Sequence, residues 1–448
     1  MENFKLSEII EYTKGILVSE NENDIITNIS SDSRIVDEHS LFVPLIGEKF
    51  DGHDFMKEVY EKGCRNFLCD ENHDIKLDAN IIKVKDTAVA LGGVAKCYRD
   101  KFTIPFIGIT GSVGKTSTKD ILYSVLRVKY NTVKNKENYN NNIGVPQTLL
   151  TVTKDTEIAV IEMGMDKKGE LDYLTNIVRP SIAVITNIGQ SHIMNFSDGQ
   201  EGIFKAKMEI TNSLTNDDLL IVNGDDKYLS TLKGNYDRSA LLTYGFNDNN
   251  DIYVKEYSTG EKESTFTCVY KEKEYSFKLA NIAKHNIGNA LIAILIGFNY
   301  NLTVEEIQKG LLNLDFSKNR LDVFETSKYR IINDTYNASF DSIMSALDIL
   351  NSFNTRKVAI LGDILELGDY SESIHRKIGK NIKCDLLITI GNHSKYINEE
   401  TSIENYHFPT KEDFYEKANS LLKENDTILV KASHGIELDK VVEFLKDE

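Results

Sequence analysis

A glycine-rich segment that ends in a lysine and a threonine is the clearest sign of chemistry in the chain. It reads G-I-T-G-S-V-G-K-T and runs from Gly108 to Thr116. Glycines let backbone N–H groups approach phosphate oxygens, Lys115 can contact the β- and γ-phosphates, and the Thr116 hydroxyl can ligate magnesium. The residues predicted to hold a nucleotide here are Gly111, Ser112, Val113, Gly114, Lys115 and Thr116.

This segment departs from the standard phosphate-loop pattern at one position. The pattern G-x-x-x-x-G-K-[ST] requires glycine at 109, where this chain has Ile109. A glycine turn followed by a surface lysine is the alternative interpretation. The apolar run before the segment, the helical pattern at 117–128 and the intact G-K-T core together favour nucleotide binding.

Two polar side chains follow later apolar runs at places where they could reach the same nucleotide. Glu162 ends the run I-A-V-I-E-M at 158–163, and His192 lies in T-N-I-G-Q-S-H-I at 186–193. An acidic residue at the carboxyl end of a strand beside a phosphate loop can hold magnesium. The alternatives are a solvated strand-end glutamate and an ordinary polar loop histidine. With the loop nearby, metal binding is favoured for Glu162 and a place in the site is favoured for His192.

The elements that position these residues alternate between strands and helices. Continuous apolar runs of this length are typical of parallel strands that helices cover on both faces. A hairpin-like stretch is expected near 251–279, followed by a helix at 286–298, and a second strand-helix alternation begins near Tyr329. The strands expected in this last part are 358–361, 386–390 and 427–430.

These patterns predict an α/β protein of three domains. At roughly 100–200 residues per domain, the length of 448 residues fits this number. A central parallel sheet that binds a mononucleotide through its P-loop is expected between a smaller N-terminal α/β domain and a Rossmann-like C-terminal α/β domain. The predicted ranges are 1–100, 101–313 and 314–448.

Composition and charge exclude several other classes. The net charge of -17 argues against sequence-independent nucleic-acid binding, which needs a basic surface. The five cysteines include no C-x-x-C pair, so reduced thiols are expected. The N-terminus lacks the basic start and apolar run of a signal peptide, and the most apolar stretch, 290–298, is too short to span a bilayer. We therefore expect a soluble cytoplasmic protein that does not span a membrane.

The phosphate-loop segment T-G-S-V-G-K-T resembles that of the Mur ligases and the folylpolyglutamate synthases. The resemblance to the Mur ligase family extends over nearly the whole chain. The most telling segment is L-G-D-I-L-E-L-G at 361–368, with His375 downstream, which is similar to the members that add a dipeptide. The other matching segments are S-D-S-R at 31–34, L-F-V-P-L-I-G at 41–47, D-G-H-D-F at 51–55, N-Y-N-N-N-I-G-V-P at 138–146, K-H-N-I-G-N-A-L at 284–291, N-R-L at 319–321, I-N-D-T-Y-N-A-S at 332–339 and K-A-S-H-G-I-E-L-D at 431–439.

The resemblance implies roles for individual residues. His192 would help to hold a second magnesium ion, and Lys207, in K-A-K-M-E-I at 205–210, would be carbamylated, with Lys205 as the alternative. From the sequence alone each lysine reads as a surface residue, so this role rests on the resemblance. The implied nucleotide-side residues are His285, Asn286, Asn289, Arg320 and Asp334, and the implied substrate-side residues are Ser33, Arg34, Asn141, Tyr336 and Asn337.

The activity implied by the resemblance is ATP-dependent amide-bond formation through an acyl phosphate. The implied cofactors are ATP, two Mg²⁺ ions and the carbamylated lysine, and the implied catalytic residues are Lys115, His192, Lys207 and Arg320. The first domain would bind a UDP-N-acetylmuramoyl-tripeptide, the second ATP, and the third the incoming D-Ala-D-Ala while closing over ATP. A monomer is expected, working in peptidoglycan synthesis and hence in cell-wall biogenesis, cell shape and cell division.

Departures from the family pattern gather in the third domain. Asn319, Phe340, Ala432 and His434 stand where the family pattern differs. They leave open a related ligase with another amino-acid or dipeptide acceptor. A catalytically silent nucleotide-binding module is the alternative of a different class. The set formed by Glu162, His192 and Lys207 argues against it, because a module that only binds nucleotide needs no two-metal site.

Overall fold

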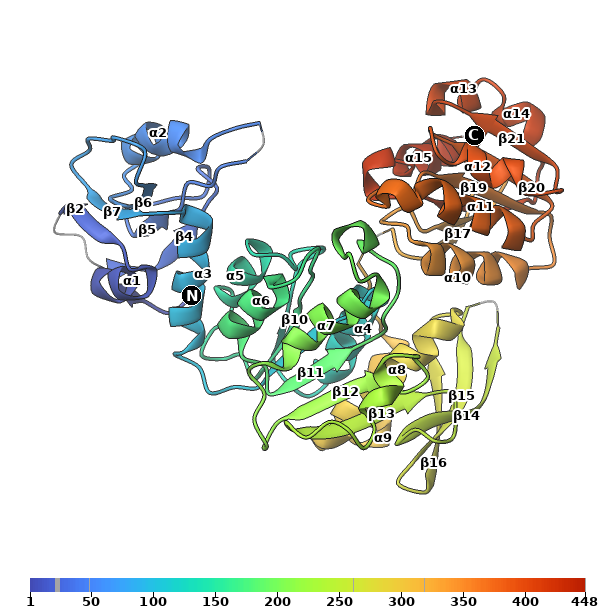
Figure 1. The fold of residues 1–448 in the computed structure, drawn as a ribbon, viewed down its shortest axis with the longest axis horizontal. Coiled ribbons are helices and arrows are strands. Elements are labelled where there is room, and N and C mark those ends of the chain that lie inside the picture. The colour runs from blue at the N-terminus through green and yellow to red at the C-terminus, as the bar shows by residue number, and fades with distance from the viewer. Residues whose placement is uncertain (21–24, 48, 261, 318, 448) are drawn as a thin grey trace.

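The computed structural model describes residues 1–20, 25–47, 49–260, 262–317 and 319–447. Its main sheets follow one another along the chain, and each belongs to a separate lobe (Figure 1). The N-terminal lobe and the C-terminal lobe stand apart on either side of the central one, so the molecule has an open V shape. The predicted three-domain α/β architecture is confirmed. The domain boundaries near 101 and 314 remain predictions.

The N-terminal domain is built on a five-stranded sheet in the order β2-β7-β6-β5-β4. β4 to β7 run parallel, whereas β2 pairs with β7 antiparallel. One face packs on α2 and the other on α1 and α3, and the side chains of α3 continue into the core of the central domain. The elements are β1 (Phe4–Lys5), α1 (Leu6–Thr13), β2 (Ile16–Ser19), β3 (Ile25–Ile26), β4 (Asn28–Ser30), β5 (Ser40–Phe42), η1 (Gly52–Phe55), α2 (Met56–Glu61), β6 (Asn66–Asp70), β7 (Asn80–Val84) and α3 (Thr87–Arg99).

The central domain holds a nine-stranded sheet in the order β16-β15-β14-β13-β12-β11-β8-β10-β9. Strands β8 to β14 run parallel. The predicted hairpin region forms β14, β15 and β16, which pair antiparallel. The strands are β8 (Phe106–Thr110), β9 (Thr132–Lys134), β10 (Ile158–Glu162), β11 (Ile182–Ile185), β12 (Leu219–Asn223), β13 (Ala240–Gly245), β14 (Ile252–Thr259), β15 (Ser264–Tyr270) and β16 (Lys273–Leu279).

Alternate side chains of these strands point to opposite faces, and helices cover both faces. In β8, for example, Phe106 enters the core under α3, α5 and α6, whereas Ile107 and Ile109 enter the core under α4, α8 and α9. This two-sided burial explains the continuous apolar runs in the sequence. The helices are α4 (Lys115–Leu126), α5 (Gly144–Leu149), α6 (Glu170–Val178), η2 (Ile193–Asn195), α7 (Gln200–Met208), η3 (Glu209–Thr211), η4 (Leu229–Leu232), α8 (Lys284–Asn299) and α9 (Val304–Leu312).

The C-terminal domain has a six-stranded sheet in the order β17-β18-β22-β19-β20-β21, parallel except for the edge strand β17. Helices α10 and α11 cover one face, and α13 and α15 cover the other. The elements are β17 (Asp322–Glu325), β18 (Arg330–Asn333), α10 (Phe340–Asn351), β19 (Lys357–Gly362), η5 (Gly368–Tyr370), α11 (Ser371–Asn381), β20 (Leu386–Ile390), α12 (Lys395–Glu399), β21 (Asn405–Phe408), α13 (Lys411–Tyr415), α14 (Ala418–Leu421), β22 (Thr427–Lys431), η6 (His434–Ile436) and α15 (Asp439–Asp447).

Two features differ from the sequence-based expectation. Strands β12 and β13 lie in a region where no strand was predicted, and the helix expected at 117–128 begins at Lys115 and ends at Leu126. The earlier start follows from Gly114, which adopts a φ of 87° and caps the helix directly after the loop. Within the described part of the chain, no helix is both long and apolar enough to cross a membrane.

Candidate active site

The phosphate-loop segment leaves β8 at the carboxyl edge of the central sheet. Because β8 lies between β10 and β11, chain connections depart from it in both directions, and such a switch point is where open α/β sheets bind ligands. Gly111 adopts a φ of 150° and Gly114 one of 87°, values that favour glycine. The loop then enters α4, so the N–H groups of its first turn and its partial positive charge face the site.

Asn187 organises the loop from the end of the neighbouring strand. Its side-chain oxygen accepts hydrogen bonds from the backbone N–H groups of Ser112 and Val113, at 3.0 and 2.9 Å. Lys115 folds back so that its ammonium donates to the Gly111 carbonyl at 2.8 Å. Burial lowers the pKa of Lys115, while the nearby Glu162 opposes this shift.

Glu162 ends β10 and is 1% exposed. Its Oε1 accepts a hydrogen bond from the Asn140 amide at 2.8 Å, whereas no described residue hydrogen-bonds to its buried Oε2. Burial would raise the pKa of Glu162, but Lys119, Lys115 and Arg320 outweigh it and lower the pKa, so the carboxylate is charged. A buried carboxylate oxygen without a hydrogen bond, in the cavity that Thr116 and the phosphate loop also line, fits a hard divalent cation.

His192 follows β11 and makes contacts from the central domain to the C-terminal domain. Its Nδ1 lies 3.3 Å from Asp166 Oδ1 and 2.9 Å from Glu366 Oε2, and Glu366 belongs to the L-G-D-I-L-E-L-G segment. Burial lowers the pKa of His192, so the neutral form that a metal ligand needs is favoured. The sequence did not reveal that two carboxylates from different domains would meet this ring.

The structure separates the two candidate lysines of α7. Lys207 is 2% exposed and points into the interior, whereas the Lys205 side chain is 59% exposed and lies 3.5 Å from Glu201. Burial, reinforced by the positive charge of Lys115, lowers the pKa of Lys207 well below its usual range. This shift favours the neutral amine, the form that adds carbon dioxide.

The first turn of α8 brings its asparagines beside the phosphate loop. The Asn289 amide donates to Asn286 Oδ1 at 2.9 Å, and both side chains line the same cavity as Gly114. His285 is half-buried and its Nδ1 lies 2.6 Å from Ser345 Oγ on α10, so this turn also contacts the C-terminal domain. Burial lowers the pKa of His285 to about 4.

The C-terminal domain contributes two cationic side chains to the site, Arg320 and Lys431. The Arg320 guanidinium carbon lies 3.8 Å from the centre of the Tyr336 ring, and no described residue accepts a hydrogen bond from its buried Nε. Lys431, at the end of β22, donates to Asp334 Oδ2 at 2.6 Å and to the Asn337 carbonyl at 2.7 Å. Lys431 was not predicted as a site residue, although it opens the K-A-S-H segment at a strand end, which is the available sequence signal.

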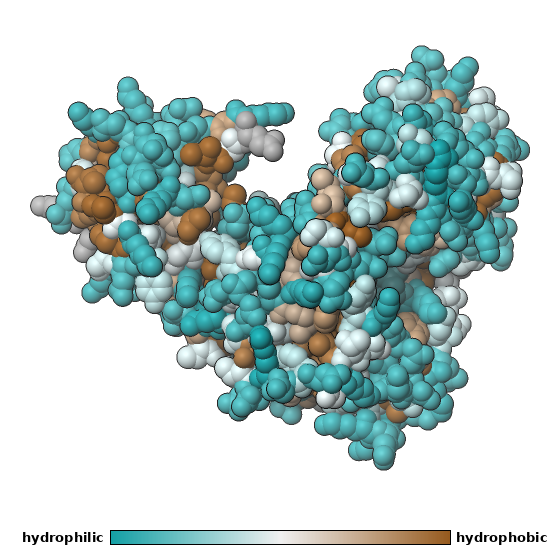
Figure 2. Space-filling model, in the orientation of Figure 1, coloured by the Kyte–Doolittle hydropathy of each residue, from teal (hydrophilic) through white to brown (hydrophobic). Residues whose placement is uncertain are grey.

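One cavity of about 1060 Å³ joins these groups across the domain boundary. Figure 2 shows the hollow between the outer domains, above the central one, with hydrophilic and hydrophobic residues exposed around it. The predicted site residues that line the cavity are Ser112, Val113, Gly114, Lys115, Thr116, Asn141, Glu162, His192, His285, Asn286, Asn289, Arg320, Asp334, Tyr336 and Asn337.

Four predicted site residues do not line this cavity. Gly111 and Lys207 lie behind it, in the loop and in α7. Ser33 and Arg34 belong to the N-terminal domain, where Ser33 lines a separate hollow of about 240 Å³. Arg34 is bound to Asp32 at 2.7 Å and is exposed. In this arrangement the hollow at Ser33 and the cavity at the phosphate loop are therefore separate.

The fold and the site together define a phosphate-loop protein with a three-domain ligase architecture, and comparisons with known proteins agree. Family models match residues 25–99 (Mur ligase family, catalytic domain), 109–297 (Mur ligase middle domain) and 319–434 (Mur ligase, glutamate ligase domain). The chain belongs to the Mur ligase family.

Among curated relatives, the UDP-N-acetylmuramoyl-tripeptide–D-alanyl-D-alanine ligase of Bacillus subtilis is 37% identical, over 98% of each chain. The Escherichia coli ligase of the same name is 30% identical, over 94% of this chain and 93% of its own. Among solved structures, MurF from Acinetobacter baumannii matches with a TM-score of 0.94 and 28% identity over the whole of both chains. MurF ligase from Thermotoga maritima, in complex with ADP, matches with a TM-score of 0.85 and 26% identity over 94% of this chain and 97% of that one.

Proposed function

We propose that this protein uses ATP and Mg²⁺ to add D-Ala-D-Ala to UDP-N-acetylmuramoyl-tripeptide in peptidoglycan precursor synthesis. The observation that carries the proposal is one cavity lined by the phosphate loop, Glu162 and His192 from the central domain and by Arg320 and Asp334 from the C-terminal domain. The curated relatives, with the activity in their names, align over nearly the full length of the chain.

Activation of the tripeptide is the first chemical step. The terminal carboxylate of the tripeptide attacks the γ-phosphorus of ATP, so that an acyl phosphate forms and ADP leaves. Lys115 and the N–H groups at the start of α4 hold the phosphates, and Arg320 approaches from the opposite wall to neutralise charge. Magnesium, for which Thr116, Glu162 and His192 are the ligand candidates, would offset the repulsion between carboxylate and triphosphate.

Amide formation completes the reaction. The amine of the dipeptide attacks the acyl carbon, and the tetrahedral intermediate releases phosphate and a proton. Tyr336 and Asn337, with Asp334 behind them, form the part of the wall where the C-terminal domain would present the dipeptide. The departures at Asn319, Phe340, Ala432 and His434 lie in this domain, so they bear on the acceptor and leave the ATP-binding groups intact.

A carbamate on Lys207 is a further part of the proposal. Its neutral amine would add carbon dioxide, lose one proton and become an anionic oxygen ligand for magnesium. The burial of Lys207 and its low pKa support this assignment over Lys205. The carbamate would also remove the cost of an uncompensated buried amine, because the added charge faces Lys115.

A coupled ADP-release assay tests the function. We expect ADP release that requires the UDP-linked tripeptide and D-Ala-D-Ala together. Turnover with a single amino acid or another dipeptide alone would retain the mechanism but contradict the proposed acceptor. No turnover with any acceptor, alongside intact ADP binding, would support the nucleotide-binding module instead.

A further inference from the structure

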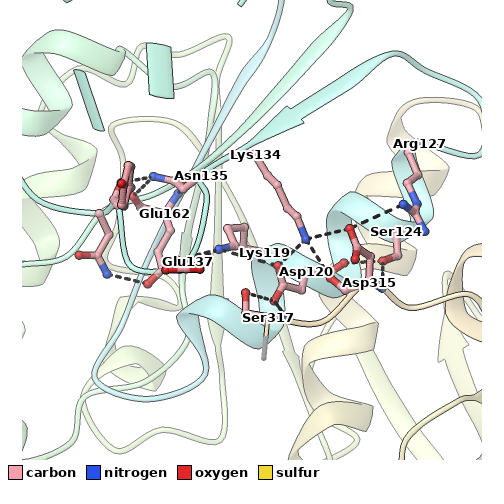
Figure 3. A network of polar contacts seen from close by, with 12 residues as sticks. Lys119, Asp120, Ser124, Arg127, Lys134, Asn135, Glu137, Glu162, Asp315 and Ser317 are labelled. Atoms are coloured by element: carbon pink, nitrogen blue, oxygen red, sulfur yellow. Dashed lines mark hydrogen bonds and ion pairs between the residues drawn. The ribbon is translucent and has the colours of Figure 1, made fainter. Parts of the chain in front are cut away.

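Two charged side chains on the phosphate-loop helix are fully buried and have no part in the reaction described above. Lys119 and Asp120 follow each other on α4, and each is 0% exposed. Figure 3 shows them between Glu162 on one side and residues 313–317 on the other. These residues, here called the linker, follow α9 and lead toward the C-terminal domain.

Lys119 lies between two carboxylates. Its Nζ is 3.6 Å from Glu162 Oε2 and 3.8 Å from Asp120 Oδ1, and it donates a hydrogen bond to the Glu137 carbonyl at 3.2 Å. Both carboxylate distances exceed a normal hydrogen bond, so the ammonium is shared and committed to neither. A small change in the charge of either carboxylate is enough to draw it toward the other, because charges interact strongly where water is excluded.

Asp120 in turn holds the linker. Its Oδ2 accepts hydrogen bonds from the backbone N–H and the hydroxyl of Ser317, both at 2.9 Å, and its Oδ1 accepts from Lys134 at 2.8 Å. Lys134 also lies 3.4 Å from Asp315, whose backbone N–H donates to Ser124 on α4 at 3.0 Å. Charges of opposite sign thus alternate without a break from Glu162 to Asp315.

The linker connects this chain of charges to the other wall of the site. Arg320 follows Ser317 by a few residues and faces the same cavity as Glu162. Buried ion pairs add little stability, because desolvation offsets most of their attraction. A buried set that joins an active-site carboxylate to an interdomain connection is therefore better explained by positioning than by stabilisation.

We propose that Lys119 and Asp120 are positioning residues that couple the cation affinity of Glu162 to the seating of the linker on α4. The inference rests on the proposed function in one respect, the role of Glu162 as a magnesium ligand. A cation at Glu162 repels the Lys119 ammonium toward Asp120. Lys119 then competes with Lys134 for Asp120 Oδ1. Conversely, when Ser317 no longer donates hydrogen bonds to Asp120, the Asp120 carboxylate attracts Lys119 more strongly. Lys119 then moves away from Glu162, and Glu162 is available to the cation.

Mn²⁺ binding to the full chain, measured by electron paramagnetic resonance at saturating ADP, tests the coupling without turnover. Lys119→Met removes the competing ammonium, so we expect Mn²⁺ to bind about threefold more tightly. Ser317→Ala removes one donor from Asp120 and should tighten binding about twofold. In the Lys119→Met background Ser317→Ala should have no effect, and Lys119→Arg should restore the parent affinity.

Arg127→Met is the matched control. Arg127 also anchors the linker, with a hydrogen bond to the Asn313 carbonyl at 3.2 Å. Its ion pair with Asp315, at 3.7 Å, is exposed to solvent and therefore weak, and Arg127 makes no contact with Asp120 among the described residues. It should leave Mn²⁺ affinity unchanged. If Lys119→Met does not fold, Asp120→Asn tests the coupling in the opposite direction. It keeps the shape and removes the charge that draws Lys119 away from Glu162, so Mn²⁺ should bind more weakly, and unchanged Mn²⁺ affinity would overturn the coupling.

The outcomes separate the coupling from the function. Unchanged Mn²⁺ affinity in Ser317→Ala, or an equal change with and without Lys119, would overturn the coupling while leaving Glu162 as a ligand. An equal effect of Arg127→Met would also overturn it, because any loosening of the linker would then suffice. If the unsubstituted chain binds no Mn²⁺ with ADP, both the coupling and the metal role of Glu162 fail.

Discussion

At the scale of single residues, Lys207 distinguishes this site from a simple nucleotide pocket. It is a fully buried lysine whose pKa lies well below the usual value because of burial and the charge of Lys115. Lys207→Ala should reduce kcat by about 100-fold or more, because the proposed carbamate could no longer form and supply an oxygen ligand to the metal. Acetate or formate should restore part of the activity by supplying a carboxylate.

Lys205→Ala is the control for this prediction, because Lys205 is exposed on the same helix. It should retain nearly full activity under the same assay. Full activity of Lys207→Ala, or equal losses in both variants, would contradict the carbamate assignment.

His285 provides a prediction about stability and pH. Its pKa is about 4 in the folded protein, below the ordinary 6.5, because the ring is buried. Between these pH values the unfolded chain binds more protons, so the free energy of unfolding falls as the pH drops from 6.5 toward 4. In His285→Asn the total decrease in the free energy of unfolding between pH 6.5 and 4 should be smaller by roughly 3 kcal/mol, as measured by urea unfolding at several pH values in this range.

His39 is an exposed histidine on the N-terminal domain and serves as the comparison. His39→Asn should leave the pH dependence of unfolding as it is in the parent. A parent-like slope in His285→Asn would show that His285 does not carry this effect.

The residues that the sequence revealed and those it did not differ in a physical way. Lys115, Thr116 and Glu162 were predicted because their spacing relative to a glycine loop and a strand end reflects local geometry. Lys431 and Lys119 depend on contacts between segments far apart in the chain, with Asp334 and Glu162 respectively. A lone lysine in a sequence carries no sign of such a partner. The strand end before K-A-S-H could have drawn attention to Lys431, but its pairing with Asp334 and the role of Lys119 are revealed only by the fold.

At the scale of elements, the loop between β8 and α4 sets the geometry of the site, and its two positive-φ glycines differ in their surroundings. A Cβ at Gly111 would collide with the Thr186 hydroxyl, whereas one at Gly114 would meet only Asn289, at 3.5 Å. Backbone strain should lower the free energy of unfolding of both alanine variants by about 1–3 kcal/mol.

The free energy of unfolding of Gly111→Ala should fall by at least about 1 kcal/mol more, because Thr186 must move at the edge of the sheet to make room for the methyl group. Urea unfolding together with ADP titration of Gly111→Ala and Gly114→Ala measures both effects. Equal stabilities would show that Thr186 yields without cost, and unaltered ADP affinity in Gly111→Ala would contradict the role of the loop.

The elements were predictable where burial is two-sided and the chain is strongly apolar. The runs that form β8, β10, β19 and β22 are uninterrupted, so their type was clear from the sequence. β12 and β13 were not predicted. β12 contains an uninterrupted apolar run at 219–222, so a sequence signal for it was present, whereas Thr243 interrupts the apolar run of β13. The register that brings Glu162 beside Ile109, and hence beside the loop, follows from sheet pairing that no local pattern encodes.

At the scale of the whole molecule, the arrangement of the domains is open. Ser33 lies in the N-terminal domain near a hollow separate from the main cavity, so a substrate held there must reach across to the phosphate loop. Next to the candidate metal ligands, the pairing of His192 with Glu366 links the central domain to the C-terminal domain. A metal ion on His192 would replace this pairing and free Glu366.

Addition of the UDP-linked tripeptide with Mg²⁺ and a non-hydrolysable ATP analogue should therefore close the molecule. Small-angle X-ray scattering should record a smaller radius of gyration with both ligands than with either alone. Ser33→Ala combined with Arg34→Ala should remove the response to the tripeptide while retaining that to the nucleotide. No change with both ligands bound would contradict domain closure.

The central claim is that ATP activates the tripeptide as an acyl phosphate before the dipeptide amine attacks. The most direct measurement uses a tripeptide in which both oxygens of the terminal carboxylate are a heavy isotope, with ATP, Mg²⁺ and D-Ala-D-Ala. We predict that every amide formed is accompanied by one inorganic phosphate that contains a heavy oxygen, because the carboxylate oxygen leaves with the phosphoryl group. Amide formation with unlabelled phosphate, or phosphate release without amide product, would contradict the account.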